Sequence, residues 1–383
     1  MSSVLARRPI QLAVVLVLAS LAIVIYTTKV AQKMPDFEVY WRAGQRAAAG
    51  EPLYRADDGH YQLKYLPGFA VLMTPLAALP PPLARALWFG GSLGALALLV
   101  VFSLRLCVDR RKAGLVLVLI TIAVMAKFYA RELVLGQVNA MFAAIAAGAL
   151  LAMRERREGL AGVLLALAVL LKPYGLLLVP WLVARREPVS IGSFAAGIAA
   201  ALSLPLIRYD LSGTIALHRD WWTTVLSTTA PNLLNPDNVS WLAMYARAGA
   251  RWPPPVPTVL WAITAVAAAV LMAAVWRVRH RVRFPEALEG ALLLLLIPLV
   301  SPQGWDYVLL VGTPAVLLVV NHEAALPRLL RMATAVALVA IGLTIYDLMG
   351  RQAYHGFLMA SGITIATFVV IAALATLRAR AAA

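Results

Sequence analysis

The sequence has little charge, because only 14% of its 383 residues are Asp, Glu, Lys or Arg, against about 25% in soluble domains. Hydrophobic residues make up 62% of the chain, and the mean hydropathy is +0.81. They occur in repeated runs that approach the roughly 20 residues needed to cross a bilayer. This composition excludes a water-soluble globular protein and predicts an integral membrane protein.

Cysteine is almost absent as well, because Cys107 is the single cysteine in the sequence. One cysteine cannot form an intramolecular disulfide, and no Cys/His cluster has zinc-ligand spacing. The five histidines are scattered, without the HExxH pair that would place two of them on one helix face. The sequence therefore supports neither a redox function nor a structural metal.

Eleven apolar runs predict membrane segments, at residues 10–28, 83–107, 114–128, 133–153, 160–183, 189–207, 256–276, 287–300, 307–320, 332–346 and 357–377. The first should remain as a helix, because Lys29 occupies the −3 position of the only candidate signal-peptide cleavage site. Lys172-Pro173 interrupts run 160–183, which has arginines at both ends, so we expect two half-helices that enter and return. The sequence thus predicts an all-α polytopic bundle of about 11 or 12 segments, as a single domain over residues 1–383.

The net charge of +16 would suggest a nucleic-acid partner in a soluble protein, but membrane topology explains it. Basic residues prefer the cytoplasmic side of short loops. With the N-terminus inside, 19 of the 34 basic residues and seven of the 18 acidic ones fall in the cytoplasm. Large outer loops then span about residues 29–82 and 208–255. We expect a multi-pass protein of the cytoplasmic membrane, its functional residues on the outer face and no nucleic-acid partner.

The first outer segment is dense in acids and aromatics, among them Asp36, Tyr40, Trp41 and Tyr54. A carboxylate just beyond the first helix can take a proton from a sugar hydroxyl as a general base, and aromatic faces can stack on sugar rings. An interfacial aromatic belt and a helix-capping Asp36 would give the same pattern. These residues taken alone leave both interpretations open.

Three other polar residues lie within predicted membrane runs: Gln137, Asn139 and Lys172. A buried cation is costly unless it meets an anion or water. A phosphate is an obvious partner for Lys172, and snorkelling or a nearby carboxylate is the alternative. Gln137 and Asn139 could contact a ligand or form hydrogen bonds between helices.

Several motifs together resemble glycosyltransferase family 87. In chain order they are Asp36-Phe37-x-Val39-Tyr40-Trp41-x-Ala43-Gly44, Gly50-x-Pro52-Leu53-Tyr54, Gly136-Gln137-Val138-Asn139, Ala161-Gly162 leading to Leu171-Lys172-Pro173, and Ser301-Pro302-x-x-Trp305-Asp306. That family contains polyprenol-phosphate-mannose-dependent α-mannosyltransferases. The resemblance implies a GT-C architecture, an active site on the non-cytoplasmic face and, by position in the motif, Asp36 as the general base.

The resemblance also implies the reaction: a sugar, mannose by resemblance alone, moves from a polyprenyl-phosphate donor to a hydroxyl of a lipid or glycan acceptor, with inversion. Phosphate is a good leaving group, so a second carboxylic acid is unnecessary, unlike in glycoside hydrolysis. We expect Lys172, Arg42 and Arg131 to offset the phosphate charge. A divalent metal is compatible but not required, and no other cofactor is expected. The expected substrate-binding residues are Tyr40, Trp41, Tyr54, Gln137, Asn139, Trp305, Asp306 and Tyr307.

The chain departs from the family pattern at two places. It has Gly304-Trp305-Asp306-Tyr307 where relatives often have Ser-Trp-Asp-His, and Tyr65-Leu66-Pro67 where they often have Tyr-Pro-Pro. The role that the histidine of the family motif would have is therefore absent here or is taken by Tyr307. Two other functions remain open, a secondary transporter and a polymerase or ligase of lipid-linked polysaccharide. The acidic, aromatic outer loops argue against a transporter, whose substrate residues lie near the midplane.

Overall fold

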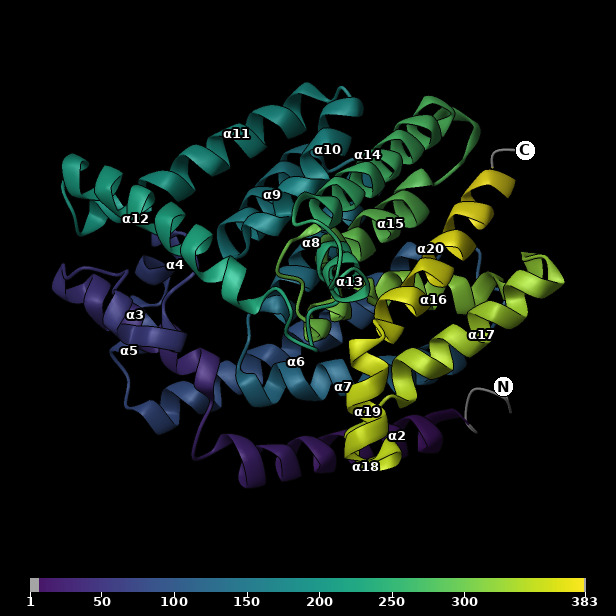
Figure 1. The fold of residues 1–383 in the computed structure, drawn as a ribbon, viewed down its shortest axis with the longest axis horizontal. Coiled ribbons are helices and arrows are strands. Elements are labelled where there is room, and N and C mark those ends of the chain that lie inside the picture. The colour runs from purple at the N-terminus through teal and green to yellow at the C-terminus, as the bar shows by residue number, and fades with distance from the viewer. Residues whose placement is uncertain (1–6, 382–383) are drawn as a thin grey trace.

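The computed structural model describes residues 7–381, and within them the chain is helical with no strand (Figure 1). The longer helices are α2 (Arg7–Ile25), α6 (Pro81–Leu106), α7 (Gly114–Leu135), α8 (Asn139–Arg154), α9 (Glu158–Leu171), α11 (Pro188–Ser203), α14 (Pro255–Arg277), α15 (Pro285–Val300), α16 (Thr313–His322), α17 (Arg328–Leu343) and α20 (Gly362–Arg380). Seven helical stretches of the described chain are long and apolar enough to cross a membrane. The protein is a multi-pass integral membrane protein, and the predicted all-α fold is confirmed.

Helices α8 and α15 form the centre of the bundle, and almost every residue of both is buried. Small residues allow this close packing, as is common between membrane helices. A Cβ atom on Gly290 of α15 would overlap the Leu150 side chain of α8. Likewise, a Cβ on Gly162 of α9 would overlap the Ser190 carbonyl oxygen of α11. Glycine at these positions therefore sets the spacing of the central helices.

Helix α7 ends later than the sequence predicts. The apolar run 133–153 was expected to be one segment, but α7 continues to Leu135 and α8 begins at Asn139. Gly136 separates them in the left-handed conformation, with φ +73°. Apolar composition alone could not reveal this break, because apolar residues continue on both sides of the turn.

The interrupted run forms two half-helices, as predicted. Helix α9 stops at Leu171, Lys172 is extended (φ −148°, ψ 120°), and the chain continues as η3 (Pro173–Leu178) and α10 (Val179–Ala184). Proline disfavours helical geometry in the residue before it, which explains the extended Lys172. Arg185, just after α10, forms an ion pair of 3.1 Å with Glu158 at the start of α9. The second half therefore returns to the end from which the first started.

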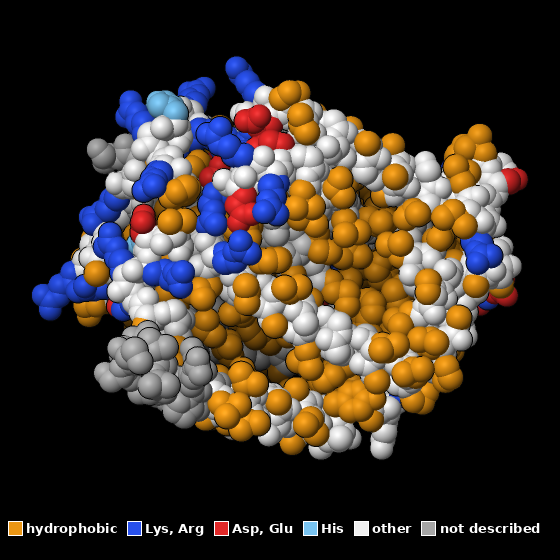
Figure 2. Space-filling view, turned by 180° about the vertical axis from the view of Figure 1, so that it is seen from behind, with side chains coloured by type: hydrophobic (Ala, Val, Ile, Leu, Met, Phe, Trp, Pro, Cys, Tyr) orange, Lys and Arg blue, Asp and Glu red, His pale blue; other side chains and the backbone are white. Residues whose placement is uncertain are grey.

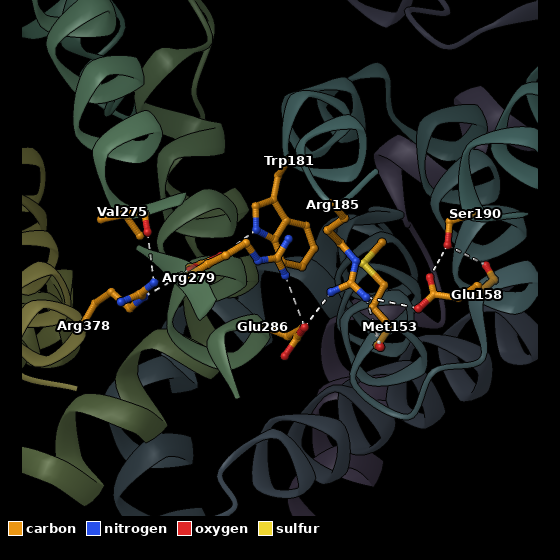
Figure 3. Close-up of polar contacts among 10 residues, drawn as sticks. Met153, Glu158, Trp181, Arg185, Ser190, Val275, Arg279, Glu286 and Arg378 are labelled. Carbon is orange, nitrogen blue, oxygen red and sulfur yellow. Dashed lines mark hydrogen bonds and ion pairs between the residues drawn. The ribbon is translucent and has the colours of Figure 1, made fainter. Parts of the chain in front are cut away.

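Lysine and arginine gather at one end of the bundle, at the left of Figure 2, while apolar side chains cover much of the remaining surface. We call this the basic end. It contains the ends of α6, α9, α10, α14, α15 and α20. Arg185 and Arg279 both bind Glu286, at 2.5 and 3.5 Å, and the buried Arg378 binds Glu289 at 2.7 Å (Figure 3). These ion pairs join loops that the positive-inside rule places on one side of the membrane.

The two long loops meet at the opposite end of the bundle (Figure 1). The first contains α3 (Pro35–Ala49), η2 (Ala56–Tyr61), α4 (Pro67–Leu72) and α5 (Thr74–Ala77), and the second contains α12 (Leu211–Thr229), η5 (Ala230–Asn232) and α13 (Trp241–Ala248). The Tyr209 hydroxyl donates to the Glu51 carbonyl at 2.8 Å. The Trp221 indole donates to the Lys64 carbonyl at 3.2 Å. Both loops thus form one layer away from the basic end.

Candidate active site

Asp36 lies in the first turn of α3, just after Pro35, where a carboxylate is favoured by the helix dipole. Its side chain is half-buried. Tyr40, one turn later, shares its face of the helix. Residues 34 and 37 pack on the turn between α7 and α8, because a Cβ on Gly136 would overlap Met34 and lie 2.8 Å from the Phe37 Cβ. The glycine thereby lets the helix that carries Asp36 approach Gln137.

Gln137 binds a group of tyrosines beside Asp36. Its Oε1 accepts hydrogen bonds from the Tyr40 hydroxyl at 2.9 Å and the Tyr65 hydroxyl at 3.0 Å, and its Nε2 donates to the Tyr307 hydroxyl at 3.4 Å. The Tyr40 and Tyr65 hydroxyls lie 2.5 Å apart. Burial raises the pKa of both tyrosines well above the usual value. They are therefore neutral hydrogen-bond donors.

Burial also raises the pKa of Asp36. The Gln137 side chain and the positive charges of Lys172, His60 and Lys64 oppose this effect. A carboxylate whose proton affinity is raised is a stronger base, provided that it is ionised at the working pH. The environment of Asp36 thus suits proton transfer.

Lys172 is buried, with 8% of its surface exposed. Its Nζ lies 5.4 Å from the ring centroids of Tyr65 and Tyr174, where the aromatic faces stabilise a cation. Within residues 12–381 no hydrogen bond or ion pair is formed by its ammonium group. The alternative in which a carboxylate pairs directly with Lys172 is therefore not what the structure shows. No ion pair neutralises it, although the negative charges of Glu132 and Asp36 act on it from a longer distance.

Arg131 forms a second charged group with two acids. Its guanidinium binds Asp237 at 2.6 Å and Asp306 at 2.8 Å, and lies 5.3 Å from the centroid of the Tyr307 ring. Trp305 stacks on that ring, with centroids 6.3 Å apart and planes at 7°. The arrangement offers a flat aromatic surface next to the tyrosine group.

Backbone hydrogen bonds hold this surface in place by pairing two distant loops. Val239 donates to the Gly304 carbonyl at 2.7 Å, and Asp306 donates to the Asp237 carbonyl at 2.9 Å. A Cβ on Gly304 would overlap the Pro298 carbonyl oxygen. This crowding explains why a glycine stands at this position.

A model of glycosyltransferase family 87 matches residues 63–302, well over half of the chain. The chain belongs to glycosyltransferase family 87. The matched range includes Arg131, Gln137 and Lys172, and it begins after Asp36. No curated protein and no solved structure matches. Family membership makes this protein a membrane glycosyltransferase.

The structure does not bring every predicted site residue of this family 87 chain to Asp36. Arg42 is exposed, and its charge acts on Asp58. Trp41 packs against the core and donates to the Leu79 carbonyl at 3.4 Å. The Tyr54 hydroxyl donates to the Tyr65 carbonyl at 2.6 Å and so supports the loop that carries Tyr65.

Glu132 is a buried carboxylate that the sequence analysis missed. Its two oxygens accept hydrogen bonds from the Asn139 side chain and the Ala140 backbone N–H, each at 2.8 Å. Its carbonyl accepts from the N–H of Gly136 and Gln137. Asn139 is itself fully buried, so in this structure it contacts Glu132 and not the open face. Glu132 thus fixes the turn that positions Gln137, and its signal in the sequence was an acid directly before the apolar run 133–153.

Replacing Gly136 with alanine should destabilise this family 87 enzyme by at least about 2 kcal/mol, from left-handed strain and overlap with Met34. We expect a lower thermal unfolding midpoint and reduced transfer. Gly94→Ala is the matched control, because no atom lies within 4 Å of a Cβ there. Equal midpoints for the two variants would show that the close approach of α3 to Gly136 is wrong.

Proposed function

We propose that this glycosyltransferase transfers one sugar, mannose by family resemblance, from a polyprenyl-phosphate donor to a hydroxyl of a lipid or glycan acceptor. The observation that carries the proposal is the proximity of a half-buried carboxylate, Asp36, to a buried ammonium group, Lys172, whose charge acts on it although no ion pair joins them among the described residues. One group suits a proton acceptor and the other suits a phosphate. Polyprenyl phosphate brings its negative charge to such a site while its chain stays in the bilayer.

The chemical step needs only one base. As the acceptor oxygen attacks the anomeric carbon, Asp36 takes its proton. The bond between the anomeric carbon and the phosphate oxygen breaks, and the lipid phosphate leaves with the electron pair. Attack from the side opposite the phosphate inverts the anomeric configuration. Asp36 ends protonated and returns the proton to water.

Lys172 would stabilise the phosphate as its charge grows. Of the three cations predicted for this role, Lys172 has no ion-pair partner among the described residues and lies near Asp36, whereas Arg131 already binds Asp237 and Asp306. Arg131 would instead hold Asp306 and the Trp305–Tyr307 stack, a platform for a sugar ring. Arg42 would contribute only at longer range.

The position of the basic end supports an outer-face site. Arginine-rich loops are retained in the cytoplasm, and the two long loops that carry Asp36 and Asp237 lie at the other end (Figure 1). With the chain in the cytoplasmic membrane, transfer would occur on the non-cytoplasmic face. A donor anchored in that leaflet would reach the site without leaving the bilayer.

Incubation of the purified protein with labelled polyprenyl-phosphate mannose and candidate lipid acceptors tests the proposed function. A single-sugar glycoside, identified by mass, is the expected product. A transporter would form no new glycosidic bond, and a polymerase or ligase would transfer a chain. Either outcome would contradict the proposal.

The pH dependence should identify Asp36 as the base. Because Asp36 must be ionised, kcat/KM for the donor should fall as the pH decreases through its raised pKa. Lys172 lowers that pKa, so Lys172→Met should move the acidic limb of the profile to higher pH. An unmoved limb would mean that another group titrates.

A further inference from the structure

A cavity of about 370 Å³ opens at the basic end, far from Asp36 along the helices. Three arginines from distant parts of the sequence line it: Arg111 between α6 and α7, Arg283 before α15, and Arg380 at the end of α20. All three side chains are exposed. None of the catalytic or sugar-binding residues proposed above contributes to it.

The cavity carries an unbalanced positive charge. Among the described residues the three guanidinium groups form no ion pair, and Asp109 is the single acidic residue in the lining. Arg380 donates to the Ala325 carbonyl, and Arg283 lies 5.0 Å from the centroid of the Phe284 ring. By contrast, nearby Lys112 and Arg378 each bind a glutamate. Gathering three unpaired cations is unfavourable unless an anion joins them.

The floor of the same cavity is apolar. Leu106, Leu318 and Leu377 line it, and all three are buried. Cationic groups at the rim and leucines beneath them, at the ends of membrane helices, suit a ligand with an anionic head and an apolar body. Basic pockets between membrane helices are typical binding sites for anionic lipid headgroups.

We propose that this cavity binds the headgroup of an anionic phospholipid in the leaflet at the basic end. The three guanidinium groups hold the phosphate, and the leucines contact the glycerol and the upper acyl chain. The site is separate from the site of sugar transfer and does not depend on the proposed function. It would attach the C-terminal end of α20 to the loops before α7 and α15.

Native mass spectrometry of the full chain, with phosphatidylglycerol and phosphatidylcholine supplied together, measures this binding. The wild type should retain phosphatidylglycerol selectively. Combined Arg111→Gln, Arg283→Gln and Arg380→Gln should weaken its binding by roughly fivefold per arginine, about 100-fold in all. The matched control combines Arg156→Gln, Arg186→Gln and Arg328→Gln. These are three exposed arginines at the same end that form no ion pair with any described residue and lie outside the cavity.

If both triple variants lost phosphatidylglycerol binding to the same extent, the lipid would be attracted to the basic end in general. That result would overturn the proposal. Unchanged retention of phosphatidylglycerol by the triple variant of the cavity arginines would overturn the proposal as well. Binding of inorganic phosphate by the wild type without any retention of phosphatidylglycerol would assign the cavity to a free phosphate and would contradict lipid binding. If the triple variant does not fold, Arg283→Gln alone should fold and still weaken the retention of phosphatidylglycerol, since the Arg283 side chain forms no hydrogen bond with any described residue.

Discussion

Asp36→Asn should nearly abolish sugar transfer while the protein still folds and inserts. Asparagine has the shape of aspartate but cannot accept the proton of the acceptor hydroxyl. A positioned general base contributes about 10²–10⁴-fold to a rate, so kcat should fall by a factor in that range. Radiolabelled transfer in proteoliposomes, with the thermal unfolding midpoint measured on the same sample, checks this expectation.

Glu38→Gln is the control for the Asp36 variant. Glu38 lies on the same turn of α3, is also half-buried, and contacts Arg85 at 4.0 Å. Its replacement removes an equal charge without touching the tyrosine group, so near wild-type transfer is expected. Near wild-type transfer by Asp36→Asn, or equal losses in both variants, would remove Asp36 from the mechanism.

Lys172→Met should lower kcat/KM for the donor by roughly 10²-fold, the usual effect of removing one electrostatic contact to developing charge. Methionine keeps the apolar stem between Tyr65 and Tyr174 but removes the cation. Because the lysine is proposed to bind the phosphate of the donor, the KM for the acceptor should change little. Initial rates with each substrate varied in turn measure the two effects separately.

Lys127→Met serves as the control for Lys172→Met. Lys127 lies on α7, and its ammonium group donates to the Thr344 carbonyl at 3.0 Å and lies 4.9 Å from the Phe128 ring centroid. Lys127 is a half-buried lysine with an aromatic neighbour, so the two variants remove the same type of group. The assignment of Lys172 to the donor phosphate would be wrong if Lys172→Met raised the KM for the acceptor instead. It would also be wrong if Lys127→Met lowered kcat/KM for the donor as much as Lys172→Met does.

Much of the fold was predictable, because hydropathy and arginine placement report directly on the membrane. The half-helices around Lys172 followed from one proline in an apolar run. Gln137 was identified as a polar residue in an apolar run. Tyr40 was identified by the acids and aromatics of the first outer segment, and Tyr307 by its place in the family motif. The structure brings these three together through hydrogen bonds.

Pairings between distant residues could not be predicted in the same way. Tyr65 is 72 positions from Gln137, and Asp237 is 106 positions from Arg131. Each pairing depends on loops whose course no local pattern encodes. The role of Glu132 was hidden for another reason: its partners are a backbone N–H and an asparagine that had an equally good interpretation as a ligand contact. Local patterns identified which residues were unusual but not which of them meet.

The structure of the protein with a non-reacting donor analogue, in which carbon replaces the bridging oxygen of polyprenyl-phosphate mannose, tests the central claim most directly. The account predicts that the phosphonate lies within hydrogen-bond distance of the Lys172 ammonium group. It also predicts that the anomeric carbon faces Asp36 with room for one acceptor hydroxyl between them. A phosphonate bound elsewhere, with Asp36 facing away from the sugar, would contradict it.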